Sequence, residues 1–375
     1  MAILKACSKV VLSKRIKSHG AHFGGRIVIA LALGCYGAAA CAEWRPYFIS
    51  EVFARSEPNS VMDAIDNWKG DYQSGERQYL VSRFEAGVKT EHWGLGLQHR
   101  WDYGLSFSPD AAEFYGAVRN DKALDSGRVY DVDLKANVIE SSGLRFSRHD
   151  LLLPTLKTEF GLTLLRSHYM IDGSLTGQAT ATGDKAYTYT AWADYAYTDD
   201  VLFGREVGPQ TGYGFSLDAH IDWQFQPQWR MDLQLRDLPG WVWWDDLPYT
   251  QATAQSQRTH TDSNGFKQWD PLVSGYEKNY STYRQTLPLK AMGDLYFSGW
   301  PVTVAAGASY QFEDLVPRVG TGKELGEWRL FGWYWPRDQA LGVDIGWNEW
   351  KVGLAMDNIR WDDAHFITVT LAYNY

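Results

Sequence analysis

The sequence predicts an all-β protein: a single antiparallel β-barrel that crosses a membrane, with about 14 strands and a range of about 12 to 16. Three observations predict it. Apolar and polar residues alternate along many extended segments, and short connections between these segments alternate with long polar ones. Beyond residue 42, no segment approaches the roughly 18 consecutive apolar residues of a membrane-spanning helix, whereas a strand needs only about 9 to 11 residues to cross.

The clearest alternation lies in residues 213–225, where aromatic and aliphatic side chains occupy every second position. After a turn at 226–228 the same pattern continues through 229–236. Soluble sandwiches also alternate, but their strands usually run about five or six residues. Further strands are expected at 80–88, 93–103, 130–138, 187–197, 287–297, 302–312, 341–347 and 367–375, with weaker alternation at 44–55, 157–171, 201–207 and 350–357. Residues 143–148 are a further candidate.

The connections between these strands differ in length on the two ends of the expected barrel. Short connections such as 91–92 and 226–228 alternate with long polar ones, as in barrels with short periplasmic turns and long outer loops. The expected long loops are 56–77, 106–127, 172–185, 239–283 and 313–339.

Several tryptophans lie where an expected strand meets a turn, at the level of lipid headgroups. A soluble core would not place them so regularly at turns. The sequence therefore predicts an interfacial aromatic girdle formed by Trp93, Trp223, Trp229, Trp300, Trp347 and Trp350.

The first 42 residues have the organisation of a secretory signal peptide. A basic segment ends at Arg26, an apolar segment runs to Tyr36, and small residues continue to Ala42, which predicts cleavage before Glu43. A lipoprotein signal at Cys35 or Cys41 is the alternative. The remainder, 43–375, is expected to be one barrel domain.

Composition excludes several classes of protein. All three cysteines precede residue 43, so thiol catalysis, disulfide scaffolds and cysteine-ligated metals are excluded for the exported chain. Six basic residues and no acidic ones fall in the first 42 positions, so removing that segment changes the formal net charge from −9 to −15. A nucleic-acid partner is not expected, because no basic cluster is available to neutralise phosphates. No cofactor, metal or catalytic residue is predicted.

The C-terminal segment carries apolar side chains at alternate positions up to a terminal aromatic residue. It resembles the C-terminal signal of Gram-negative outer-membrane β-barrel proteins, although terminal Phe is the commoner form. The resemblance implies insertion by the barrel-assembly machinery, a location in the outer membrane, and contact with its lipid and lipopolysaccharide. A closing strand must also pair with the first strand to remove the open sheet edge. The expected assembly-signal residues are Ile367, Val369, Leu371, Tyr373 and Tyr375.

Candidate functional residues lie on the polar faces of the expected strands. Placing Phe225 opposite Trp229 puts Asp218 across from Arg236, His220 from Gln234, and Asp222 from Asp232. The two facing carboxylates repel each other unless Arg230, a diagonal neighbour of Asp222, relieves the charge. The expected lumen-lining residues are Asp131, Asp133, Lys135, Asp218, His220, Asp222, Arg230, Asp232 and Arg236. An alternative makes the Asp and His residues of this set a hydrolytic or ion-binding cluster.

Two long loops contain aromatic residues beside carboxylates. Such residues bind a sugar or peptide at the mouth of a barrel, or form an outer girdle. These candidates are Trp241, Trp243, Trp244, Trp333 and Trp335.

The leading functional hypothesis is a porin-like channel or small-solute transport barrel with an acidic, mixed-charge lumen. One alternative is a barrel enzyme acting on lipid, lipopolysaccharide or peptide. Another is a non-catalytic accessory or adhesin barrel whose loops bind a partner.

Overall fold

The computed structural model describes residues 44–374, apart from 67, 257–258, 262–266 and 270–272. The predicted signal peptide and Tyr375 lie outside the described residues. The helices are α4 (Val61–Ile65), α5 (Pro109–Arg119) and the 3-10 turn η2 (Trp361–Asp363). The strands are β1 (Arg45–Ser56), β2 (Arg77–Lys89), β3 (Trp93–Phe107), β4 (Val129–Leu153), β5 (Leu156–Gly183), β6 (Ala186–Tyr197), β7 (Gly212–Gln226), β8 (Trp229–Gln255), β9 (Thr259–Thr261), β10 (Lys267–Trp269), β11 (Val273–Thr286), β12 (Lys290–Phe297), β13 (Thr303–Gln311), β14 (Asp314–Leu325), β15 (Trp328–Trp335), β16 (Ala340–Trp347), β17 (Trp350–Met356) and β18 (Phe366–Tyr373).

Fourteen of the described strands form a closed antiparallel barrel, which confirms the predicted fold class. The ring follows chain order from β1 to β5, continues through β7, β8 and β12, and follows chain order again to β18. β18 pairs with β1 from Phe366 opposite Arg55 to Tyr373 opposite Phe48. The ring therefore has no open edge, as lipid requires.

At two places in the wall, two strands lie end to end along one long neighbouring strand. β7 pairs with the first half of β5 and β6 with the second half, so the wall continues after residues 198–211 leave it. Likewise β12 pairs with the start of β8 and β11 with the rest. The predicted strand at 201–207 is wrong, because this segment is an irregular connection between β6 and β7.

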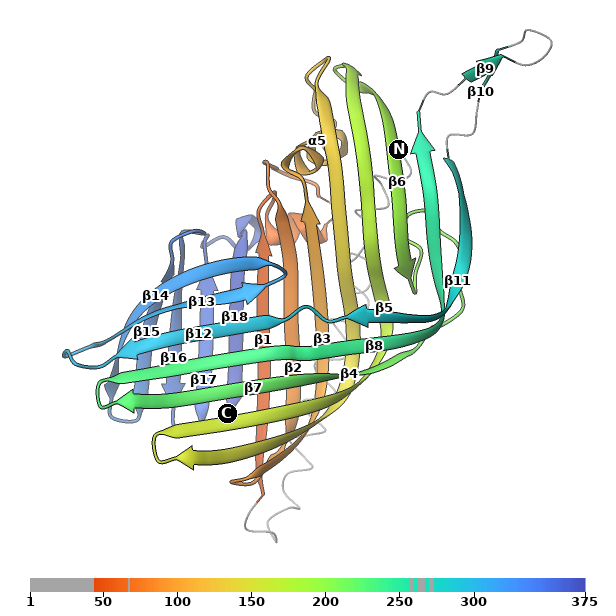
Figure 1. Cartoon of the computed structure of the whole chain (residues 1–375). Coiled ribbons are helices and arrows are strands. Elements are labelled where there is room, and N and C mark those ends of the chain that lie inside the picture. The colour runs from red at the N-terminus through yellow and green to blue at the C-terminus, as the bar shows by residue number, and fades with distance from the viewer. Residues whose placement is uncertain (1–43, 67, 257–258, 262–266, 270–272, 375) are drawn as a thin grey trace.

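The wall has two very different heights. β4, β5 and β8 contain 25, 28 and 27 residues, whereas β15 to β18 contain seven or eight each. Figure 1 shows the resulting tall wall of β4, β5 and β6 beside the shorter blue strands. We call the part of this wall beyond the short strands the extension.

The prediction of three long loops is wrong. Residues 172–185 mostly belong to β5, 239–283 mostly to β8 and β11, and 313–339 mostly to β14 and β15. Segments 56–77 and 106–127 are long connections and carry α4 and α5.

Outward and inward faces of the wall have opposite character. On β3 the outward side chains Trp93, Leu95 and Leu97 are 54%, 38% and 64% exposed, while inward Gln98, Arg100 and Asp102 are buried. An apolar outward band with a polar interior is the arrangement of a membrane barrel. Within the described residues, no helix is long and apolar enough to span a membrane.

The predicted tryptophans gather at one end of the wall. Trp93, Trp229 and Trp350 begin β3, β8 and β17, and Trp347 ends β16, all next to short turns. This short-turn end therefore carries one aromatic girdle, of the kind expected at a lipid interface. The opposite end is called the long-loop end below.

Candidate functional site

The lumen holds the polar side chains that the sequence placed together. β7 and β8 pair as expected: Asp218 lies opposite Arg236, His220 opposite Gln234, and Asp222 opposite Asp232. The turn itself differs, since Gln226 rather than Phe225 lies opposite Trp229. The register therefore followed from strict alternation even though the turn was placed one residue away.

The two facing carboxylates have cationic partners. Arg230 Nε donates to Asp222 at 2.7 Å, and Arg230 Nη2 lies 3.7 Å from an Asp232 carboxylate oxygen. His220 Nε2 lies 3.2 Å from Asp232. Arg230 thus relieves the repulsion as expected, and Asp222 and Asp232 form parts of two ion pairs.

These residues line a cavity of about 500 Å³ that extends from the short-turn end into the lumen, which we call the vestibule. Its described lining contains ten Lys and Arg residues against eight Asp and Glu residues, so the predicted acidic excess is not found there. Charges of both signs line its wall. The negative charge of the whole chain therefore does not describe the vestibule.

A second set of charges lies inside the lumen beside the vestibule, whose lining it shares through Lys290. Asp237 accepts hydrogen bonds from both terminal nitrogens of Arg100 at 2.8 and 2.7 Å, and from Lys290 Nζ at 2.8 Å. Lys290 also lies 3.2 Å from Asp102, which pairs with Arg100. All four are between 1% and 8% exposed. We call Arg100, Asp102, Asp237 and Lys290 the buried charge layer.

A bulge in β8 places Asp237 in this layer. Ser216 lies opposite Gly240 but Asp218 opposite Arg236, so β8 has two extra residues here. Asp237 takes φ 60°, a left-handed conformation that Asp adopts more readily than most residues. Ser216 Oγ donates to it at 2.8 Å. Sequence reasoning missed this layer, because its members come from strands that are distant in the chain.

A further ionic group joins the vestibule to the buried charge layer. Glu85 is fully buried, accepts from Tyr47 Oη at 2.7 Å and Gln98 Nε2 at 3.0 Å, and pairs with Arg83. Arg145 donates to Glu159 at 2.7 Å across the adjoining strands. A small cavity of about 20 Å³ between the vestibule and the buried charge layer leaves space for about one water molecule.

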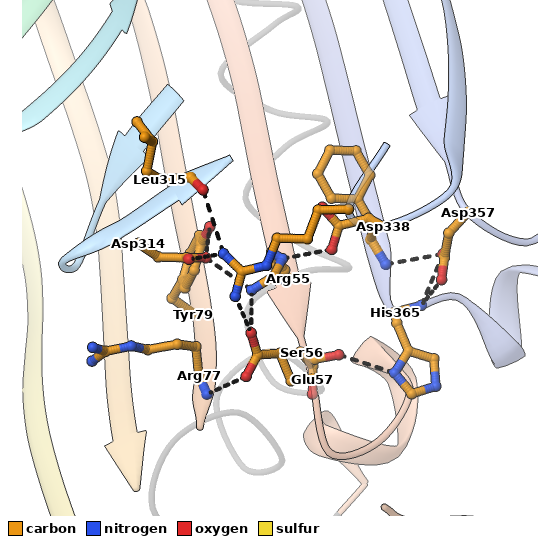
Figure 2. Close-up of polar contacts among 12 residues, drawn as sticks. Arg55, Ser56, Glu57, Arg77, Tyr79, Asp314, Leu315, Asp338, Asp357 and His365 are labelled. Carbon is orange, nitrogen blue, oxygen red and sulfur yellow. Dashed lines mark hydrogen bonds and ion pairs between the residues drawn. The ribbon is translucent and has the colours of Figure 1, made fainter. Parts of the chain in front are cut away.

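Charged side chains also fill the long-loop end over the short strands. Figure 2 shows Arg55 between three carboxylates: its nitrogens lie 2.8 Å from Glu57, 2.8 Å from Asp314 and 2.7 Å from Asp338. Glu57, beyond the end of β1, also accepts from the Glu76 N–H at 2.7 Å. Burial raises the pKa of Glu57, but this backbone bond and Arg55 outweigh it, so the pKa lies below its usual value.

The other predicted lumen residues lie elsewhere. Asp131, Asp133 and Lys135 have the inward orientation on β4, but they belong to the extension and are exposed. They are outside the vestibule lining. Asp133 N–H instead bonds the hydroxyl of Ser108, the residue that caps α5.

The tryptophans predicted on loops all lie in strands, so that prediction is wrong. Trp241 and Trp243 lie on the outward face of β8 beside Phe215, and Trp244 is completely buried. Trp333 and Trp335 belong to β15 and line the vestibule, where Arg318 stacks 4.3 Å from the Trp333 ring. The sequence did not predict this strand, because aromatic residues on its inward face remove the alternation of apolar and polar residues.

The C-terminal strand has the predicted alternation. Ile367, Val369, Leu371 and Tyr373 occupy outward positions of β18, while Thr368, Thr370 and Ala372 line the vestibule. No group of three or more His, Cys, Asp or Glu side chains suited to a metal ion occurs among the residues described.

The barrel is closed and has an apolar outward band, an aromatic girdle at its short-turn end and a charged interior. These features define a transmembrane β-barrel of the outer-membrane class. In this class the short-turn end is periplasmic and the long-loop end extracellular.

No known protein family matches the chain, and no curated protein matches it. Among solved structures, it is similar to a TodX deltaS2S3 mutant monoaromatic hydrocarbon channel, with 9% identity and a TM-score of 0.43 over 89% of this chain and 91% of the other. It is also similar to the CymD monoaromatic hydrocarbon channel, with 9% identity and a TM-score of 0.39 over 88% and 87%. A Pseudomonas aeruginosa FadL homologue gives 8% identity and a TM-score of 0.33 over 88% and 89%.

Proposed function

We propose that this protein is a gated transport barrel of the outer membrane that passes small hydrophilic solutes. The observation that carries the proposal is the depth of the vestibule, which leads from the periplasmic end to the buried charge layer. The barrel therefore differs from a permanently open porin, because four buried side chains obstruct its route. The outward residues of β18 are proposed as its assembly signal.

The chemistry of the vestibule favours hydrophilic solutes. Besides its charges, it contains Ser309 Oγ and Gln311 Oε1, which are buried and have no hydrogen-bond partner within the described residues. Buried polar atoms of this kind require water or a solute group as partner. With both signs of charge present, the lining can contact either end of a zwitterion, and no cation preference follows.

Opening requires the buried charge layer to rearrange. Its ion pairs balance one another, so the closed state leaves no buried charge without a partner. Separating them in a low-dielectric interior is costly unless water enters with the solute. Solute or water arriving from the vestibule supplies that hydration, and the passage then stays open only while it is hydrated.

Recordings from the purified, folded barrel in planar bilayers test the proposal. Wild type should be closed for most of the recording. The double variant Arg100→Ala with Asp237→Ala removes two side chains of the buried charge layer without changing the net charge, and should raise mean conductance several-fold. A control, Asp222→Ala with Arg230→Ala in the vestibule, should leave mean conductance close to wild type.

Folding of each variant is checked by its heat-modifiable migration on gels. If the folded Arg100→Ala, Asp237→Ala barrel conducts no more than wild type, the lumen is not the route and the proposal fails. A several-fold rise in the control alone would contradict it equally, because the obstruction would then lie in the vestibule.

A further inference from the structure

An apolar cavity lies on the outward face of the extension, separate from the lumen. Its floor comes from β3, β4 and β5 through residues such as Leu105, Leu134 and Leu175, all with outward orientation. Two covers flank it: α5 on one side and residues 198–211, which we call the strap, on the other. Trp68 lines it as well. The cavity has a volume of about 80 Å³ and a predominantly hydrocarbon lining. Figure 1 shows α5 beside the tall strands at this level.

Both covers are fixed by polar contacts of their own. Asp200, 5% exposed, accepts bonds from three strap N–H groups at 3.0 to 3.1 Å and from Tyr195 Oη at 2.5 Å. At the start of α5, Ser108 Oγ accepts from the Ala111 N–H and donates to the Asp131 carbonyl. Each cover is therefore held by contacts that do not involve the other.

The cavity lies beyond the lipid band. On β3 to β5, an ionisable group interrupts the outward apolar residues: His168 Nε2 is 3.1 Å from Glu140, and His99 is 3.8 Å from the same carboxylate. Leu97 lies before this group and Leu105 beyond it on the same strand. An acyl chain reaching the cavity from the bilayer would have to cross these polar side chains, so access is from the extracellular side.

We propose that this cavity binds a small apolar molecule, or the three- or four-carbon apolar end of a larger one, taken from the extracellular side. Protein interiors rarely leave voids larger than a water molecule, and apolar cavities remain dry. A cavity of about 150 Å³ lined by Leu, Ile and Phe takes benzene or xenon, so half that volume fits a smaller group. The inference is independent of the proposed transport function, since it uses none of the lumen residues.

Xenon locates the site directly. Crystals of the full barrel pressurised with xenon should show an anomalous peak between Leu105 and Leu175. Ala136, which lines the cavity, gives the filling variant Ala136→Leu, whose xenon occupancy should fall by at least about tenfold. The matched control Ala306→Leu adds the same side chain to the lipid-facing surface of β13 and should keep the peak.

A solution measurement extends the test to an aliphatic ligand. Saturating n-butane should raise the thermal unfolding midpoint of wild type and Ala306→Leu in amphipol, and should not raise that of Ala136→Leu. If Ala136→Leu does not fold, the enlarged variant Leu105→Ala should bind benzene at the cavity while wild type does not. A wild-type crystal without a xenon peak there, equal butane responses in all three proteins, or no benzene binding in Leu105→Ala overturns the proposal.

Discussion

Replacing Asp237 by Asn should strongly destabilise the barrel, because it removes the carboxylate that holds two buried cations. In the variant, Arg100 and Lys290 share the single carboxylate of Asp102, leaving one positive charge uncompensated among side chains that are at most 9% exposed. Breaking a buried ion pair by removing one partner typically costs about 3 to 5 kcal/mol. We expect about 3 kcal/mol, the lower end, since Asp102 remains.

Urea unfolding in detergent micelles, followed by tryptophan fluorescence, measures this cost. A second substitution, Lys290→Gln, restores neutrality, so the double variant should be less destabilised than the sum of the single changes by about 2 kcal/mol. The control is Asp222→Asn, whose partner Arg230 has a side chain 45% exposed; it should cost less than about 1 kcal/mol. If Asp237→Asn costs no more than Asp222→Asn, or the two layer substitutions simply add, the buried layer is not electrostatically coupled.

Gly104 should resist substitution, because a Cβ there would overlap the ring of Phe312; Gly104→Ala should lower the unfolding midpoint in urea, and adding Phe312→Ala should restore most of it. Glu57 should make stability depend on pH: its lowered folded pKa contributes stability that is fully present above the unfolded value of 4.5 and is lost as pH falls through the folded value. Unfolding measured between pH 7 and 3 should therefore flatten in Glu57→Gln, and an unchanged profile would show that other groups cause the dependence. Removing the cap of α5 by Ser108→Ala should cost about 1 kcal/mol locally and speed hydrogen exchange of the Ala111 amide, whereas unchanged exchange would mean that the cap does not hold this helix.

The barrel class and part of its register could be predicted because some strands separate apolar and polar residues completely. On β7 the outward positions include Ile221 and Trp223, and the inward positions include His220 and Asp222. Such a strand has one possible orientation in a membrane wall, so its pairing with β8 followed from alternation alone.

The predicted number of strands was right, but its members differ. The strand expected at 201–207 does not exist, the one at 187–197 is β6, which shares its place in the wall with β7, and β14 and β15 were not predicted. β14 was missed because Pro317 and Lys323 occupy outward positions and glycines interrupt it. β15 was missed because Phe331 and Trp333 are inward, which makes both faces apolar. Conversely, the strap looked like a strand since Val201 and Phe203 are apolar, but they pack against the outward face of the extension.

The buried charge layer could not be predicted from the sequence. Arg100 and Asp237 are 137 positions apart, and they meet only because the wall closes and β8 bulges beside Ser216. Neither closure geometry nor a bulge has a local signature in these residues. The vestibule residues of β7 and β8 were found because they lie on one hairpin.

The pairing of β1 with β18 sets an order of events for assembly. The carbonyl of Ser56, where β1 ends, bonds His365 309 positions later. β2 follows β1 directly, but β18, its other partner in the wall, is synthesised and exported only after nearly all of the chain. A strand edge exposed for that time is a template for wrong pairing. The speed of closure, and the protection of β1 before closure, should therefore decide how much of the newly exported chain reaches the membrane and how much aggregates.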